Sequence, residues 1–114
     1  MERKLMSDIE YKFNEKNYLE EIQSYVDATY GSHYSQNKFQ TTEVVVDNGH
    51  GEGFCLGNVV KYAQRYGKKG SGPEEYRKDL LKIIHYGIIA LYNHDMIRKM
   101  ENENENQWTN STDT

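Results

Sequence analysis

The sequence of 114 residues has a single cysteine, a single proline and no long apolar run. Because Cys55 is the only cysteine, the chain cannot form an internal disulfide or, by itself, a zinc site that needs several cysteines. Its longest apolar segment, Ile83 to Tyr92, is interrupted by His85 and Gly87, and crossing a bilayer takes about 20 apolar residues. The first residues lack the apolar stretch of a secretory signal. We therefore expect an intracellular protein without a membrane span.

Hydrophobic residues are also scarce, at 36% of the chain, and the mean hydropathy is −0.96. A monomer of this length buries only a modest core. The composition therefore indicates that part of the chain lies outside the core and that the protein shares core with a partner. We expect a homo-oligomer built from one small domain.

The net charge of −4 is unevenly distributed. Between Lys61 and Lys82, seven lysines and arginines stand against three acids, so this segment carries +4 and the rest of the chain carries −8. A basic segment in an acidic protein is typical of a site for an anionic ligand. Alternatively, the lysines and arginines of this segment are only the solvated surface of a helix end and a loop. The overall negative charge disfavours nonspecific binding of nucleic acid, which depends on phosphate contacts.

Apolar residues at helical spacing predict a mainly α, small helical domain at residues 8–100. Pro73, followed by two acids, is typical of a helix start, and Gly67 is typical of a helix end. The last two helices are therefore expected to form a C-terminal antiparallel pair. Helices are expected at residues 8–30, 53–66 and 73–100.

The remaining segments are expected to be less regular. Residues 1–7 are interpreted as a flexible N-terminus and residues 33–40 as an irregular connection. Residues 41–47 (TTEVVVD) have the β-branched composition of a strand but no evident partner strand, so we expect a short helix or an extended segment. Residues 101–114 (ENENENQWTNSTDT) are polar and of low complexity. Such a segment cannot offset the entropy of ordering, and it is expected to be a disordered tail.

Two apolar rows in the helix at 53–66 predict a broad buried face. They are Leu56, Val60 and Ala63, and Cys55, Val59, Tyr62 and Tyr66. The final helix is apolar over so much of its circumference that we expect it to be central or to meet another subunit. His85 lies on that apolar surface and is expected to be a histidine of the core.

A polar stripe runs beside the buried face predicted for the helix at 53–66. Phe54, Asn58, Lys61 and Arg65 are spaced i, i+4, i+7 and i+11, which puts them on one side of a helix. Phe54 is suited to stack on a base, and Asn58 is suited to bond a base edge or a ribose. Lys61 and Arg65 are suited to hold phosphates. The basic end is extended by Lys68 and Lys69.

Packing accounts for the same spacing. In that interpretation Phe54 lies in the core and Asn58 bonds locally. The two bases of the stripe then pair with acids of the final helix, of which Asp79 is the first choice. The chain has no GxxxxGK(S/T) phosphate-binding loop, so any transfer of a phosphoryl group would not use that architecture.

Polar residues at fixed offsets also connect the chain with a known family. The resemblance to the SaV-like family of small phage proteins rests on HYSQNKFQTTEVVVDNGHGEGFCLGNVVKYAQRYGKK, followed by DLLKIIHY. The details GHGEGF and YGKK resemble versions carried by tailed phages of cyanobacteria. The matching positions are His33 and Tyr34; Gly53, Phe54, Gly57, Asn58, Lys61, Tyr62 and Arg65; and Asp79, Leu80, Lys82, His85 and Tyr86.

The resemblance implies a phage protein of the host cytoplasm with a nucleotide-related role, because some members are described as nucleotide kinases. The resemblance also adds four residues to the expected ligand-binding set, which are His33, Tyr34, Asp79 and Lys82.

Three functions of different classes fit these observations. The first is an enzyme resembling a nucleoside monophosphate kinase, which would require magnesium. The second is a protein that sequesters a nucleotide, such as a host signalling nucleotide that serves defence, without turnover. The third is an inhibitor that binds a host protein through its acidic surface. The sequence assigns no catalytic residue, no metal ligand and no cofactor other than magnesium in the first case.

Overall fold

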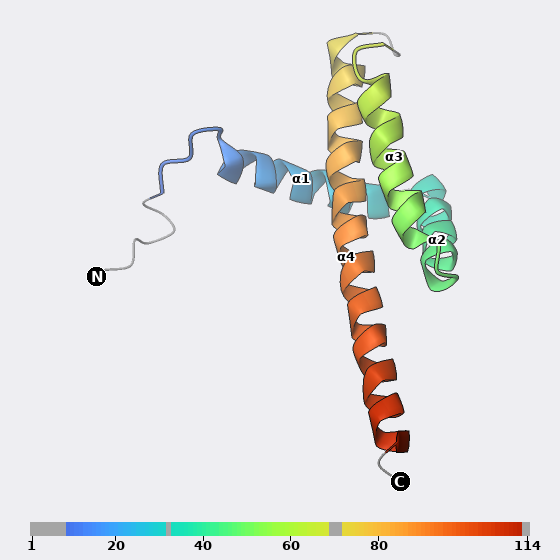
Figure 1. The fold of residues 1–114 in the computed structure, drawn as a ribbon. Helices are drawn as coiled ribbons and strands as arrows, with labels where there is room; N and C mark the ends of the chain where they lie inside the picture. The colour runs from blue at the N-terminus through green and yellow to red at the C-terminus, as the bar shows by residue number, and fades with distance from the viewer. Residues whose placement is uncertain (1–8, 32, 69–71, 113–114) are drawn as a thin grey trace, which may run out of the picture.

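The protein is described by a computed structural model that covers residues 9–31, 33–68 and 72–112, without the side chains of 33–37 and 106–112. Within that part of the chain all regular structure is helical, and no strand occurs. This confirms the prediction of a mainly α fold (Figure 1). The described residues form four helices, which are α1 (Glu15–Tyr30), α2 (His33–Asp47), α3 (Gly51–Arg65) and α4 (Pro73–Thr112).

Helices α3 and α4 form the expected antiparallel pair, with α3 lying along the N-terminal half of α4 (Figure 1). The connection follows the signals in the sequence. Gly67 has a φ of +76°, the left-handed conformation that ends many helices. The carbonyl of Gly72 accepts the N–H groups of Glu75 and Tyr76, so Gly72 caps α4 just before Pro73.

The core of the protein is small and lies mainly between α3 and α4. Cys55 is 0% exposed, so it is a packing residue, as its position on the apolar face predicts, and this burial raises the pKa of its thiol. Among the residues whose side chains are described, the buried hydrophobic ones are Ile22, Cys55, Tyr62 and Tyr86. The buried polar ones in the same part of the chain are Thr42, Asp79, His85 and Asn93.

The predicted burial of the row Leu56, Val60 and Ala63 is wrong, because all three residues are exposed. Helix α3 packs chiefly on α4, and a helix with one main neighbour buries one stripe of its surface. That stripe carries Cys55 and Tyr62. The aliphatic row therefore remains on the outside of the α3–α4 pair.

The irregular connection predicted at 33–40 is wrong, because these residues belong to helix α2. Residues 41–47, for which a short helix or an extended segment is expected, are the second half of the same helix. Packing overrides the strand propensity of the valines here. The ring of Phe39 stacks on Tyr30, with centroids 4.7 Å apart, and lies 5.6 Å from the ring of His85. Inside the helix, the hydroxyl of Thr42 donates to the carbonyl of Lys38 at 2.9 Å.

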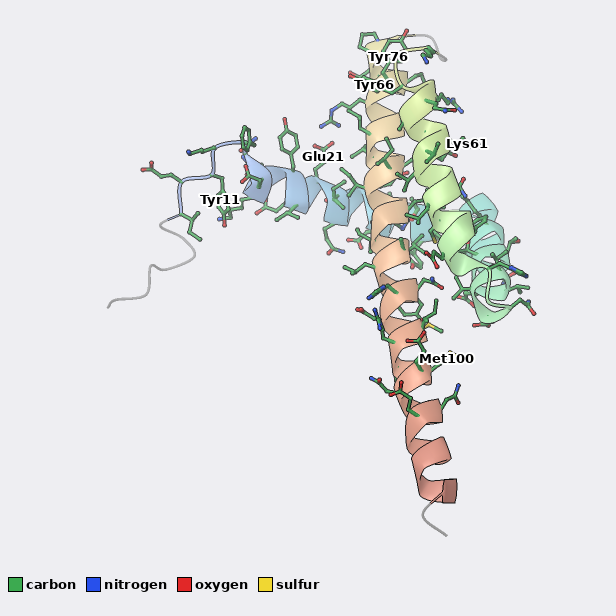
Figure 2. All side chains as sticks on the ribbon, viewed as in Figure 1. Tyr11, Glu21, Lys61, Tyr66, Tyr76 and Met100 are labelled. Carbon is green, nitrogen blue, oxygen red and sulfur yellow. The ribbon has the colours of Figure 1, made fainter. Side chains whose placement is uncertain are left out.

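Helix α1 begins at Glu15, later than the predicted start at residue 8. Asn14, just before it, has a φ of +57°, and the N–H of Phe13 donates to Glu15 Oε1 at 2.6 Å. The helix crosses α4, and its N-terminal half extends away from the α3–α4 pair (Figure 1). Arg77 of α4 forms an ion pair with Glu21 of α1 near this crossing (Figure 2).

Helix α4 continues to Thr112, whereas the sequence predicts a disordered tail from Glu101. The side chains of residues 101–105 are exposed, and this half of the helix extends beyond the other elements (Figure 1). Glutamate is a good helix former, and an existing helix adds residues more readily than a new one nucleates. The other residues predicted as flexible, 1–7 and 113–114, lie outside the described residues. Among the helices described, none has the length and apolarity to cross a membrane.

Candidate functional site

The stripe on α3 is occupied largely by contacts within the protein. The ring of Phe54 packs edge-on against Tyr86, with centroids 6.1 Å apart. The amide of Asn58 donates to the carbonyl of Phe54 at 2.9 Å. Arg65 Nε lies 3.5 Å from Asp79 Oδ1. The local bond of Asn58 and the pair of Arg65 with Asp79 agree with the packing interpretation. Phe54 is only half-buried, and the ammonium group of Lys61 lies over the ring of Tyr62 instead of against an acid.

In the ion pair of Arg65 and Asp79, the aspartate is buried and the arginine is partly exposed. Asp79 is 1% exposed. Within the described part of the chain, neither Arg65 Nε nor Asp79 Oδ2 has a hydrogen-bond partner. A buried carboxylate without its cation is costly, so the position of Arg65 next to Asp79 contributes to the stability of the α3–α4 pair.

A cavity of about 210 Å³ lies where the four helices meet, and it differs from the predicted stripe. Each helix contributes at least one aromatic or basic side chain to its wall. The lining residues are Tyr25 and Thr29 of α1, Lys38, Phe39 and Thr42 of α2, Tyr62 of α3, and Lys82, His85, Tyr86 and Ile89 of α4. We call this cavity the central pocket.

Two lysines of the central pocket lie against a pair of tyrosine rings. Lys38 Nζ is 5.0 Å from the centroid of the Tyr86 ring, and Lys82 Nζ is 5.0 Å from the centroid of the Tyr62 ring. The two rings are nearly parallel, at 16°, with centroids 6.0 Å apart. Contacts between cations and aromatic faces of this kind are favourable. They hold two ammonium groups from different helices at one cavity.

The charge of the central pocket follows from its surroundings. Burial acts to lower the pKa of Lys38, but its hydrogen bond to Tyr86 and the nearby tyrosines outweigh this effect and raise the pKa, so Lys38 stays cationic. Burial lowers the pKa of His85, with a further contribution from Lys38, so His85 is neutral at pH 7. Burial also raises the pKa of Tyr25 and keeps its hydroxyl protonated.

Among the described residues, those that line the central pocket include no aspartate or glutamate. The two ammonium groups therefore face hydroxyls, a neutral imidazole and aromatic rings, and the pocket is positive. In the part of the chain that is described, no three histidines, cysteines or acids gather in a way that suits a metal ion.

Of the ligand-binding residues predicted from the sequence, Lys82 lines the central pocket. Lys61 is exposed, with its Nζ 5.1 Å from the centroid of the Tyr62 ring, and Lys68 is exposed just after α3. Lys69 lies outside the described residues. His33 and Tyr34 stand at the start of α2, and their side chains lie outside the description. The other predicted residues, Phe54, Asn58, Arg65 and Asp79, do not line the pocket.

Two residues of the central pocket gave no usable signal in the sequence. Tyr25 reaches it because α1 packs on α4, and Lys38 reaches it because α2 packs on α1 and α3. The sequence predicts an irregular connection at 33–40, which places Lys38 on no helix. Tyr62, His85 and Tyr86 did give a signal, because they stand at the fixed offsets quoted for the family resemblance.

One family model covers most of the residues of this site. The family model DUF3310, described as a protein of unknown function, matches residues 28–87. The match covers the end of α1, all of α2 and α3 and the first part of α4, and it includes both lysines of the central pocket. No curated protein and no solved structure matches the chain.

Proposed function

The chain belongs to the DUF3310 family, a family of unknown function, and we propose from its central pocket that it binds a nucleotide. The observation that supports this is the placement of Lys38 and Lys82, from different helices, on tyrosine rings at one cavity whose described lining contains no acid. Two fixed cations next to aromatic faces match the two parts of a nucleotide, its phosphate and its base.

The chemistry of each part can be assigned to side chains. A phosphate monoester carries a charge of about −1.5 to −2 at neutral pH, which two ammonium groups neutralise. The rings of Tyr62 and Tyr86 are buried and lie against the two ammonium groups, so they give the base an aromatic wall to pack against rather than free faces on which to stack. Neutral His85 adds one hydrogen-bond donor and one acceptor. The site proposed here therefore shares Lys82 with the set predicted from the sequence and replaces Lys61 and Arg65 by Lys38.

The size of the pocket favours binding over transfer of a phosphoryl group. Pockets for ligands of drug size usually measure about 300 to 1,000 Å³, and the central pocket measures about 210 Å³. It accommodates the phosphate and part of one nucleoside, whereas a kinase must hold a donor and an acceptor together with magnesium. We therefore propose a protein that sequesters a nucleotide. Turnover of ATP that depends on magnesium would instead support the kinase-like function.

The phage origin and the host cytoplasm are parts of the same proposal that rest on the resemblance to SaV-like proteins. A nucleotide-sequestering protein of a phage would act on a nucleotide of the infected cell. Binding of a host protein through the acidic surface is the alternative to be considered if no nucleotide binds.

The test is calorimetric titration with mono-, tri- and cyclic nucleotides, with and without magnesium. Replacing Lys38 or Lys82 by methionine removes a charge-assisted hydrogen bond worth about 1.5 to 3 kcal/mol, so affinity should fall about 10- to 100-fold. Lys61→Met is the matched control, because Lys61 contacts the ring of Tyr62 without lining the pocket. Equal losses in Lys61→Met and Lys82→Met, or no binding of any nucleotide, would contradict the proposal.

A further inference from the structure

A second and larger cavity lies open on the surface between α1, α2 and α4. It measures about 710 Å³ and is lined mainly by apolar side chains, among them Leu19, Ile22, Val26, Ile88 and Tyr92. We call it the apolar groove. Leu19 is 68% exposed, Ile88 48% and Tyr92 61%. Large exposed apolar patches are uncommon on monomeric proteins and mark interaction sites.

The surface of the whole chain indicates that a partner is missing. A compact monomer of 13.4 kDa has an accessible surface of about 6,500 Å², and this chain has 9488 Å². Its radius of gyration is 19.0 Å, compared with about 13 Å for a compact chain of this length. The exposed half of α4 contributes to the excess of roughly 3,000 Å². Obligate dimers bury about 2,000 to 5,000 Å² counted over both partners, or about 1,000 to 2,500 Å² per chain, so the excess of one chain is large enough for its half of such an interface.

Helix α1 shows most directly that its own chain does not complete its packing. An isolated helix of this length is only marginally stable in water. Of the 16 residues of α1, Ile22 alone is buried. Leu19, three positions earlier on the same stripe, points its apolar surface to solvent at the mouth of the groove. A stable α1 therefore requires a further surface against this stripe.

We propose that a second copy of this chain covers the apolar groove. An isologous pair, the commonest symmetry of homo-oligomers, places the α1 and α4 stripes of one protomer against those of the other. This covers Leu19, Ile88 and Tyr92 in both copies at once. A second copy also explains how a chain with few hydrophobic residues is stabilised. The small core of each copy is extended by the apolar layer that forms where the two grooves meet.

The proposal has a consequence for the central pocket that rests on the proposed nucleotide binding. Phe39, Thr42, His85 and Ile89 line both the apolar groove and the central pocket. These residues form a wall with the ligand site on one side and the groove on the other. A second copy seated in the groove excludes water from that wall and fixes the positions of its side chains. Association of the two copies therefore strengthens nucleotide binding.

Sedimentation velocity of the full chain tests the interface without any ligand. The unmodified protein should sediment as a dimer or a larger oligomer, and Tyr92→Glu should shift it to the monomer. Leu91→Glu is the matched control. Leu91 is 63% exposed and outside the groove, and consecutive helical side chains point about 100° apart. Leu19→Glu provides a second groove variant, on a different helix, and circular dichroism verifies that each variant is folded.

Monomeric sedimentation of the unmodified protein would overturn the proposal, as would dissociation by Leu91→Glu with retention of the oligomer in both groove variants. Nucleotide titration of the same proteins then separates the two proposals. Oligomers that bind no nucleotide would contradict only the proposed function. Monomeric groove variants that bind nucleotide as tightly as the unmodified protein would contradict the coupling between groove and pocket.

Discussion

At the scale of single residues, His85 has the environment with the clearest chemical consequence. Its ring lies between those of Tyr25 and Phe39, at centroid distances of 5.9 and 5.6 Å. Burial, assisted by the charge of Lys38, lowers its pKa below the ordinary value of 6.5. The imidazole of His85 therefore takes up a proton less readily in the folded protein than in the unfolded chain, where its pKa has the ordinary value.

This environment predicts how stability depends on pH. The unfolded chain takes up the proton at about pH 6.5, and the folded chain takes it up only at lower pH. The contribution of neutral His85 is therefore fully present above about pH 6.5 and is lost as the pH falls from there through the lower folded pKa. Urea unfolding at pH 7 and pH 5.5 should show a smaller loss of stability in His85→Leu than in the unmodified protein. Equal losses in the two proteins would contradict this assignment.

Arg65 and Asp79 lead to a prediction that separates a structural role from ligand binding. Arg65→Met leaves the buried carboxylate without its cation. Removing one partner of a fully buried pair costs about 3 to 5 kcal/mol, and we expect about 2 kcal/mol here because the side chain of Arg65 is 32% exposed. The double variant Arg65→Met/Asp79→Asn should regain part of this loss in chemical denaturation.

The affinity of Arg65→Met for nucleotide should stay unchanged at a temperature where the variant is folded, because Arg65 does not line the central pocket. A large loss of affinity with unchanged stability would restore the predicted stripe as the binding surface. The two measurements together thus distinguish the interpretations that the sequence left open.

The residues of the stripe and of the central pocket show which parts of the site could be predicted from the sequence. The spacing of Phe54, Asn58 and Arg65 correctly indicates a shared helix face, but spacing contains no information about what lies opposite that face. Lys82 entered the predicted set because its position matches the family pattern. Lys38 did not, because its place beside Tyr86 depends on how α2 docks, and docking is a property of the tertiary structure.

At the scale of helices, the elements with strong local signals were predicted best. Gly67, Gly72 and Pro73 mark the turn between α3 and α4, and the structure has its turn there. Helix α2 has weak signals of its own, with three valines in a row. It is helical because Phe39 stacks on Tyr30 of the preceding helix and reaches His85 of α4. A contact between residues so distant along the chain cannot be read from local composition.

Gly51, the first residue of α3, lies so close to α4 that a larger side chain there should destabilise the protein. A Cβ atom at Gly51 would overlap the side-chain amide of Asn93, which is itself buried on α4. Gly51→Ala should therefore push α3 away from α4 and cost about 1 to 3 kcal/mol. Gly57→Ala is the control, because a Cβ there meets open space. It should stabilise the helix by about 0.5 to 1 kcal/mol. Urea unfolding measures both, and equal effects of the same sign would refute the close packing at Gly51.

At the scale of the whole molecule, the central pocket and the core occupy one end of the protein and much of α4 lies beyond them. The lining of the central pocket ends at Ile89, and Asn93 is the last buried residue among the described side chains of α4. Beyond that point Met100 lies on the part of α4 that extends away from the other helices (Figure 2). The low hydrophobic content of the sequence agrees with this division between a packed half and an exposed half.

Deleting residues 101–114 should therefore leave the folded protein intact. The deletion removes the exposed side chains of residues 101–105 and one surface pair, in which Arg98 Nη1 lies 3.8 Å from Glu101 Oε2. Such pairs contribute about 0 to 1 kcal/mol, so the free energy of unfolding and the affinity for nucleotide should change little. Deletion from residue 90 onward removes buried Asn93 and should abolish cooperative unfolding. A clear loss of stability or of oligomerisation in the shorter deletion would show that the far end of α4 packs on a partner.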